Sequence, residues 1–194
     1  MTLKYVTVDE FKTYPSGIKI TIGPDKCFVD ETAVGLYLEV VESLVEQFIG
    51  RSLVYQEYTE NFIGNNSDLY FPINKPIDTI TSLKEYTLYG NTLTEIELDS
   101  YNNTEYSVYY YYEYNNDSKY ELVYKAGYST IPLDFKHAIY MQATRMLERD
   151  AAGIISSESY MNQKNAYREP DPSSGLYPEV MMLLRPYKNY IYTQ

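Results

Sequence analysis

The sequence predicts an α+β protein, a small helical bundle with an antiparallel β-sheet or hairpin region inserted between its two long helices. Two stretches place apolar residues at the three- and four-residue spacing of amphipathic helices, and the segment between them changes to the two-residue spacing of strands. Because 194 residues can bury a sizeable core, we expect one domain over residues 1–194. Its expected parts are N-terminal helices (1–53), a tyrosine-rich β region (54–125), the second long helix (131–153), a polar loop or arm (154–177), and a short helix with a tail (178–194).

The first long helix is predicted between Asp30 and Gly50. Asp30 is a suitable N-cap, Glu31 lies in the electropositive first turn, and Gly50 supplies a left-handed stop. The apolar stripe between them consists of Ala33, Leu36, Tyr37, Val40, Val41, Leu44, Val45, Phe48 and Ile49. Such a stripe must pack against another element.

The second long helix is predicted from Pro132 to about Gly153. Pro132 suits the first helical position, where its missing N–H costs nothing, and Asp134 lies in the first turn. The apolar face is expected to contain Phe135, Ile139, Ala143, Met146 and Leu147. The side chains expected to point outward are Lys136, Gln142, Arg145 and Glu148.

The region between these helices is predicted to form strands joined by turns. Residues 53–63 read as a strand, 64–68 as a turn and 69–71 as a returning strand, which predicts a hairpin. Pro72 and Pro76 cannot donate to a β ladder, so this part is expected to be an edge or a connector.

Two further strand pairs flank short turns. Residues 80–88 and 92–98 lie on either side of one turn, and residues 107–112 and 120–124 lie on either side of another. Together, these pairings predict one small antiparallel sheet.

Tyrosine is unusually frequent, with 25 copies and no tryptophan. A dense group consists of Tyr106, Tyr109, Tyr110, Tyr111, Tyr112 and Tyr114. In one interpretation, alternate tyrosines line the core and a solvated face. In the other, some of them form an exposed aromatic surface for a protein partner, because tyrosine offers rigid amphipathic area at small entropic cost. Stacking on nucleic-acid bases is less expected, since no basic residues interleave with these rings.

The C-terminal part is predicted to contain a third, short helix that begins at Pro178 and is stopped by Pro186. The tail that follows, residues 187–194, is apolar, and two interpretations stay open. It adds to a neighbouring chain, by strand addition or by docking alternate side chains, or it folds back on its own domain.

Charge and composition exclude several classes of function. The net charge is −11, and no segment gathers lysine and arginine into a stripe, so avid phosphate binding is not expected. The same acidity suits a surface along which DNA moves without sticking. A single cysteine, Cys27, forms no internal disulfide, and with one histidine it makes no Cys/His zinc site. No apolar run approaches a membrane span or a signal peptide, so we expect a soluble protein with no membrane partner.

A catalytic site is not expected. His137 lies early in the second helix with no coupled nucleophile, so a partly exposed position or a packing contact is its expected role. Glu39, Glu42 and Glu46 have the spacing of one polar helical face, which we expect to be solvated. Calcium-loop and phosphate-loop spacings are missing from the sequence. We therefore expect no enzyme activity, no cofactor and no metal.

Several short motifs follow one another in a characteristic order. They are VTVDEFK at 6–12, FIGRSL at 48–53, FPINKPI at 71–77 with ITSL at 80–83, LVYKAGY at 122–128 with IPLDFKHAI at 131–139, and PEVMMLLRPYK at 178–188. This order resembles the head-tail connector proteins of tailed bacteriophages, also called adaptor or head-completion proteins. In that family the first motif corresponds to a short opening helix, which would complete a bundle with short helices at both ends.

The resemblance implies a structural virion protein. Such a protein forms a closed ring of identical subunits, commonly about twelve, beneath the portal vertex. It extends the DNA channel and joins the capsid to the tail, so the implied partners are the portal protein, a tail or second ring protein, and genomic DNA passing through the lumen without sequence-specific binding. The implied location is the head-tail interface of the virion, after assembly in the host cytoplasm.

The resemblance also directs attention to two surfaces. We expect portal docking by Tyr187, Lys188, Tyr190, Ile191 and Tyr192. We expect a contact with the neighbouring subunit or the tail at the tyrosine group 106–114. Segments 92–119 and 154–175 are longer than simple members of the family need, so no contacts are carried over to them. The alternative from another class is a tyrosine-rich ligand- or carbohydrate-binding module of a tail or surface protein.

Overall fold

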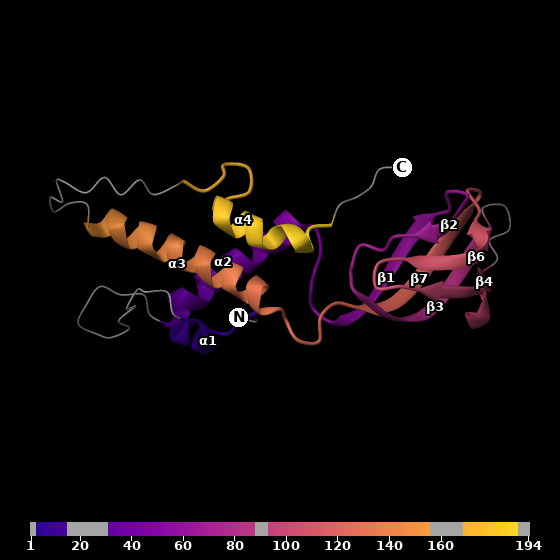
Figure 1. The fold of residues 1–194 in the computed structure, drawn as a ribbon, viewed down its shortest axis with the longest axis horizontal. Coiled ribbons are helices and arrows are strands. Elements are labelled where there is room, and N and C mark those ends of the chain that lie inside the picture. Colours follow the sequence, from indigo (N-terminus) through magenta and orange to yellow (C-terminus); the bar gives the residue numbers. More distant parts are fainter. Residues whose placement is uncertain (1–2, 15–30, 88–92, 156–168, 190–194) are drawn as a thin grey trace. The chain divides into compact units, whose positions relative to one another are not determined.

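The computed structural model describes residues 3–14, 31–87, 93–155 and 169–189, and the chain divides into two units (Figure 1). The helical unit consists of Met1–Gly50 and Ile131–Gln194, and the β unit consists of Arg51–Thr130. The expected α+β class is confirmed as a mixed protein with four α-helices and, in place of one sheet, two antiparallel sheets within the described ranges. The single domain over 1–194 stays a prediction.

The helical unit begins with α1 (Val8–Thr13), which a capping box starts. The Thr7 side chain accepts a hydrogen bond from the Glu10 backbone N–H at 3.1 Å, and the Glu10 carboxylate accepts one from the Thr7 N–H at 3.1 Å. The next helix, α2 (Glu31–Ile49), ends where Gly50 takes a φ of +74°, as its left-handed stop requires. The predicted N-cap Asp30 lies outside the described residues.

The core of the helical unit lies between α2, α3 (Leu133–Ile155) and α4 (Pro178–Leu184). A short 3₁₀ turn, η2 (Arg185–Tyr187), follows α4. The buried residues of α2 recur with helical periodicity and are Val34, Gly35, Leu38, Val41, Glu42, Val45 and Ile49. From α3 and α4 the core receives Phe135, Ala138, Ile139, Ala143, Leu147, Val180 and Leu184.

Two predictions of solvated polar side chains are wrong. Glu42 is only 3% exposed, because its carboxylate accepts hydrogen bonds from the backbone N–H groups of Lys4, Tyr5 and Val6. Gln142 is buried because its amide donates to the Gly175 carbonyl at 3.0 Å and accepts from the Tyr177 N–H at 3.0 Å. Each of these side chains forms hydrogen bonds with backbone groups of a segment that is not paired within a helix or a sheet, and this is why each is buried.

The β unit contains two antiparallel sheets. The four-stranded sheet has the order β1 (Gln56–Ile63), β7 (Ser118–Ala126), β3 (Ile77–Thr87) and β4 (Leu93–Glu95). The three-stranded sheet has the order β2 (Ser67–Tyr70), β6 (Val108–Tyr114) and β5 (Tyr101–Asn103). A 3₁₀ turn, η1 (Leu98–Ser100), precedes β5.

Only one of the three predicted strand pairings is present. Strands β3 and β4 pair as expected, but β1 pairs with β7 rather than β2, and β6 pairs with β2 and β5 rather than β7. At both expected hairpins the chain crosses from one sheet to the other. The crossings meet at Gly64, where a Cβ would lie 2.0 Å from the Asn115 carbonyl oxygen. The turn residues therefore mark where the chain reverses, but not which strand it then accompanies.

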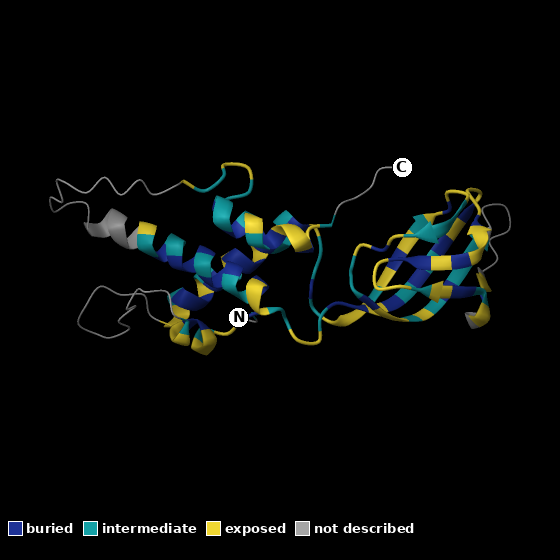
Figure 2. Cartoon of the chain, viewed as in Figure 1, coloured by how far each residue is buried: buried dark blue, intermediate teal, exposed yellow. Residues whose placement is uncertain are grey.

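The core of the β unit lies between the two sheets and is largely aromatic. Strand β7 alternates buried and less buried residues along its length, and Figure 2 shows buried segments on strands of both sheets. The core cluster consists of Ile77, Leu83, Ile96, Tyr101, Val108, Tyr110, Tyr114, Tyr120, Leu122, Tyr124 and Ala126. Five tyrosines of this unit thus belong to its core.

Candidate interaction surfaces

The six tyrosines of the 106–114 group divide between core and surface. Tyr110 and Tyr114 are buried between the sheets. The exposed members are Tyr106, Tyr109, Tyr111 and Tyr112. Both interpretations of the tyrosine group therefore apply, each to different rings.

A bulge in β6 determines which rings are exposed. Ser67 of β2 lies opposite Tyr114, and Leu69 lies opposite Tyr109, so residues 110–113 of β6 face Asp68 alone. The alternation of buried and exposed residues ends there, since residues 111–113 are all exposed. Tyr111 and Tyr112, neighbours in sequence, are 55% and 68% exposed. Extra residues in one strand redirect side chains in this way.

The exposed rings belong to separate contacts. Tyr109 and Tyr111 pack edge to face, with ring centroids 5.4 Å apart at 74°. Tyr112 packs instead on Tyr110, at 5.6 Å and 64°. Sugars bind best to flat, open rings, and the edge-to-face pair offers a smaller platform than coplanar rings would. Tyr109 and Tyr111 therefore do not form a coplanar platform.

Acidic residues lie near the pair formed by Tyr109 and Tyr111, Asp68 on β2 and Glu113 on the same strand as the pair. Asp68 precedes Leu69, which lies opposite Tyr109, and the negative charge of its carboxylate raises the pKa of Tyr109. Glu113, two residues beyond Tyr111, is exposed. We call Asp68, Tyr109, Tyr111 and Glu113 the tyrosine face.

A buried carboxylate holds the connector that follows β2. Glu60 of β1 accepts hydrogen bonds from the Tyr70 hydroxyl at 2.9 Å, from the Ile73 N–H at 3.0 Å and from the Tyr124 hydroxyl. Burial, with the Glu60 charge, raises the pKa of both Tyr70 and Tyr124. Arg51 donates to the Lys75 carbonyl at 2.9 Å. Sequence reasoning did not single out Glu60, because nothing in its strand pattern separates it from solvated glutamates.

The residues expected to dock on the portal are only partly described. Tyr187 is buried; its hydroxyl donates to Asp134 at 2.6 Å, and its ring packs edge to face on Phe135 at 5.3 Å. Lys188 is exposed, with its ammonium 4.7 Å from the centroid of the Phe48 ring. The Asn189 N–H donates to the Ile49 carbonyl at 2.7 Å. The chain up to Asn189 thus lies on its own helical unit.

The other three docking residues, Tyr190, Ile191 and Tyr192, lie outside the described residues. Portal docking stays a prediction, and among the described members only Lys188 presents its side chain to solvent.

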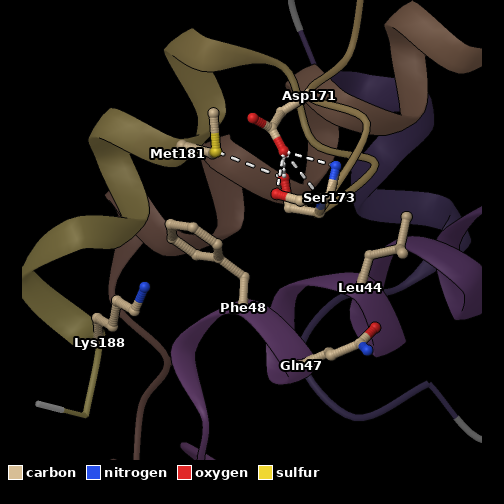
Figure 3. A pocket seen from close by; sticks show the side chains of 8 residues that line it. Leu44, Gln47, Phe48, Asp171, Ser173, Met181 and Lys188 are labelled. Carbon is tan, nitrogen blue, oxygen red and sulfur yellow. Dashed lines mark hydrogen bonds between the residues drawn. The ribbon is translucent and has the colours of Figure 1, made fainter.

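A pocket of about 270 Å³ lies beside Lys188 in the helical unit (Figure 3). Its lining residues are Leu44, Gln47, Phe48, Asp171, Ser173, Ser174, Met181 and Lys188. Asp171 accepts hydrogen bonds from the Ser173 side chain, and from the N–H groups of Ser173 and Ser174 at 2.8 and 3.0 Å. These bonds lower the pKa of Asp171. The loop is therefore fixed by its own side chains, and it forms part of the pocket lining.

An apolar strip of α2 borders this pocket. Leu36 and Val40 are 47% and 48% exposed, although the sequence places both in the apolar stripe. The stripe is wider than the buried face of α2, which includes Val34, Leu38 and Val41. Leu36, Val40 and the pocket residue Leu44 follow each other at four-residue spacing, so they share one helical face. We call these three residues the α2 strip.

His137 makes a packing contact. Its Nδ1 lies 2.5 Å from the Tyr14 hydroxyl, and the rings are 5.4 Å apart. Within the described ranges no group of three His, Cys, Asp or Glu side chains is arranged to hold a metal ion. The described helices include none with the length and apolar character that a membrane crossing requires.

Protein-family models and curated proteins yield no match to this chain. Solved structures do match along nearly its whole length. A chain from the neck of an empty gene transfer agent particle, computed with C6 symmetry, is 14% identical with a TM-score of 0.56, over 98% of this chain and 93% of that one. A chain from the neck of the native particle, computed with C12 symmetry, is 16% identical with a TM-score of 0.55, over 98% and 96%.

A chain from the virion of the native gene transfer agent particle is 14% identical with a TM-score of 0.58, over 95% of this chain and 90% of that one. At these identities the likeness is one of fold. Both the helical unit and the β unit take part in it, because the matches cover nearly every residue.

Proposed function

We propose that this protein is a structural component of the neck of a tailed-phage-like particle, a head-tail connector. The observation that carries the proposal is the shared fold, over at least 93% of both chains, with neck chains solved in C6 and C12 symmetry. This function requires no chemical reaction: identical subunits form a ring, about twelve copies, beneath the portal. The ring extends the DNA channel and joins the capsid to the tail.

A closed ring requires two different surfaces on each subunit that fit one another. The α2 strip supplies one apolar surface on the helical unit. Leu133 of α3 and Met182 of α4 are also exposed on this unit and are candidates for the complementary surface. Burial of such side chains at a subunit interface is favourable, at roughly 25 cal/mol per Å² of apolar area.

The acidity of the chain supports a channel for DNA. With a net charge of −11, its surface repels phosphates on average, so the genome is not held by lasting contacts. Portal docking is assigned to the C-terminal segment that begins at Lys188. The location is the head-tail interface of the virion, with assembly in the host cytoplasm and a tail or second ring protein as the distal partner.

The test is co-assembly with the portal protein encoded by the same genome, followed by negative-stain microscopy. We expect rings stacked on the portal. Leu36→Glu combined with Val40→Glu places two charges in the α2 strip and is expected to abolish rings, whereas Ile63→Glu, at an exposed apolar residue of the β unit, serves as the matched control. A wild-type protein that stays monomeric and never decorates the portal contradicts the proposal.

A further inference from the structure

The three-stranded sheet carries negative charge and no positive charge. Its strands β2, β5 and β6 contain two acidic residues, Asp68 and Glu113, and no Lys or Arg, and the wider stretch 85–118, which also includes residues of β3 and β4 in the other sheet, contains seven Asp or Glu residues and no Lys or Arg. The β unit as a whole has twelve acidic and five basic residues. This surface is complementary to a cationic partner and repels nucleic acid.

The tyrosine face combines rings and carboxylates within one surface. Asp68 precedes Leu69, which lies opposite Tyr109 in the β2–β6 ladder, and the Tyr111 ring packs edge to face on Tyr109 at 5.4 Å. A guanidinium stacks on an aromatic ring and pairs with a carboxylate at the same time, because its plane and its N–H fork serve different neighbours. The face thus offers both of the contacts that arginine makes best.

The face is held in place by the core beneath it. The bulge that exposes residues 111–113 is bounded by two buried rings, Tyr110 and Tyr114. Tyr114 packs on Tyr110 at 5.3 Å and on Tyr120 of the other sheet at 5.1 Å. Since the exposed rings stand on a fixed strand, binding orders few new side chains.

We propose that the tyrosine face docks an arginine- or lysine-bearing segment of a different protein. The inference rests on the proposed function only for its setting, in which a neighbouring protein of the particle supplies that segment. A second copy of this chain is a poorer occupant, because the helical unit is also acidic, with fifteen acidic and eleven basic residues.

The test measures binding of a fluorescently labelled ten-residue peptide of alternating glycine and arginine to the full-length protein by anisotropy. Tyr109→Ser with Tyr111→Ser removes the rings, and Asp68→Asn with Glu113→Gln removes the charges. Tyr112→Ser is the matched control, since it removes an exposed tyrosine of the same strand that packs elsewhere. Near-UV circular dichroism checks that each variant is folded.

We expect each double variant to bind the peptide about tenfold more weakly than the wild type and Tyr112→Ser, and binding to weaken as salt is raised. Equal binding by the double variants and the control overturns the inference, as does equal binding of a peptide of alternating glycine and glutamate. Loss of self-association in the double variants, measured by sedimentation, also overturns it, because the face would then join copies of this chain.

The two proposals fail separately. Rings on the portal depend on the α2 strip, whereas peptide binding depends on the tyrosine face. Normal rings without peptide binding overturn only this inference, and specific peptide binding by a protein that never joins the portal overturns only the connector function.

Discussion

Two tyrosine hydroxyls in the core of the β unit have opposite energetic roles. The Tyr124 hydroxyl donates to the buried carboxylate of Glu60 and accepts from the Asn74 N–H at 3.2 Å. The Tyr114 hydroxyl is buried and has no hydrogen-bond partner among the described residues. A buried polar group without a hydrogen-bond partner lowers the free energy of unfolding of the protein. Removing a donor from a buried carboxylate also lowers it, because the carboxylate is then left with an unmade hydrogen bond.

We therefore expect Tyr124→Phe to lower the free energy of unfolding by about 1–3 kcal/mol and Tyr114→Phe to leave it unchanged or raise it. Each substitution removes one oxygen atom and keeps the ring, so each is the control for the other. Urea unfolding of the full-length protein, followed by circular dichroism, measures both. Equal destabilisation by the two variants contradicts the assignment.

Glu42 is a second residue whose role depends on its position in space. Its two carboxylate oxygens accept from three successive backbone N–H groups, at 2.8, 2.8 and 3.2 Å, and thereby fix the segment before α1. Glu42→Gln replaces one acceptor oxygen by a donor, and we expect it to lower the free energy of unfolding by about 1–3 kcal/mol. The same change at Glu39, a partly exposed residue of the same helix, is expected to have little effect. Amide hydrogen exchange at residues 4–6 reports the loss directly, and unchanged protection there contradicts the prediction.

These residues show where sequence reasoning stops at the residue scale. Glu39, Glu42 and Glu46 have a spacing that predicts one solvated helical face, and the three residues do lie on one helix, α2. Glu42 is buried nonetheless, because the segment before α1 covers it and needs its oxygens. A local pattern contains no information about a segment that lies 36 to 38 residues away.

At the scale of elements, helices were easier to predict than strand pairing. Caps, prolines and glycines act locally: α2 ends at Gly50 and α4 begins at Pro178, as predicted. Strand pairing depends on distant segments. The chain reversal after β1 is predicted, although Ser67 and Asp68 of the predicted turn belong to β2, and the predicted partner of β1 is wrong. The close approach of Gly64 to Asn115 decides the crossing, and a turn signal cannot report it.

The β unit is expected to unfold at alkaline pH. Burial raises the pKa of Tyr120 to about 12, and burial also raises the pKa values of Tyr70, Tyr114 and Tyr124. Unfolded tyrosine has a pKa of about 10, so above that pH the unfolded chain loses protons that the folded chain retains. The folded state then binds more protons, and stability present below pH 10 is lost as the pH rises through the folded pKa values.

Absorbance at 295 nm measures this ionisation, and circular dichroism measures the fold at each pH. We expect a delayed group of tyrosines that ionises together with loss of β structure above about pH 10. If all 25 tyrosines titrate together near the unfolded value while the β structure persists, the core assignment is contradicted.

At the scale of the whole molecule, the chain enters the β unit and leaves it again at one place. The Tyr128 N–H donates to the Leu53 carbonyl at 2.9 Å, and Val54 and Tyr128 form a β-bridge. The sequence predicts a strand border near each of these two segments, but it does not predict that the two segments are neighbours in the fold. The tyrosine group is likewise evident in the sequence. The bulge is not, because it depends on the register between β2 and β6.

The fragment Arg51–Thr130 is expected to fold in isolation, because its two ends are joined by the Val54–Tyr128 bridge and its hydrophobic core cluster contains only residues of the β unit. Its near-UV circular dichroism and its tyrosine titration should match those of the β unit in the full-length protein, and urea should unfold it in one cooperative step. Gly127 provides a sharp variant: it has a φ of +105°, and a Cβ there would lie 2.3 Å from the Val54 carbonyl oxygen. Gly127→Ala is therefore expected to destabilise the fragment strongly, whereas Thr130→Ala, at an exposed position outside the bridge, should not. If the fragment shows no near-UV circular dichroism signal, the prediction is contradicted. The contacts between the two ends of the β unit are then insufficient to keep its two sheets packed, and the helical unit is needed for folding.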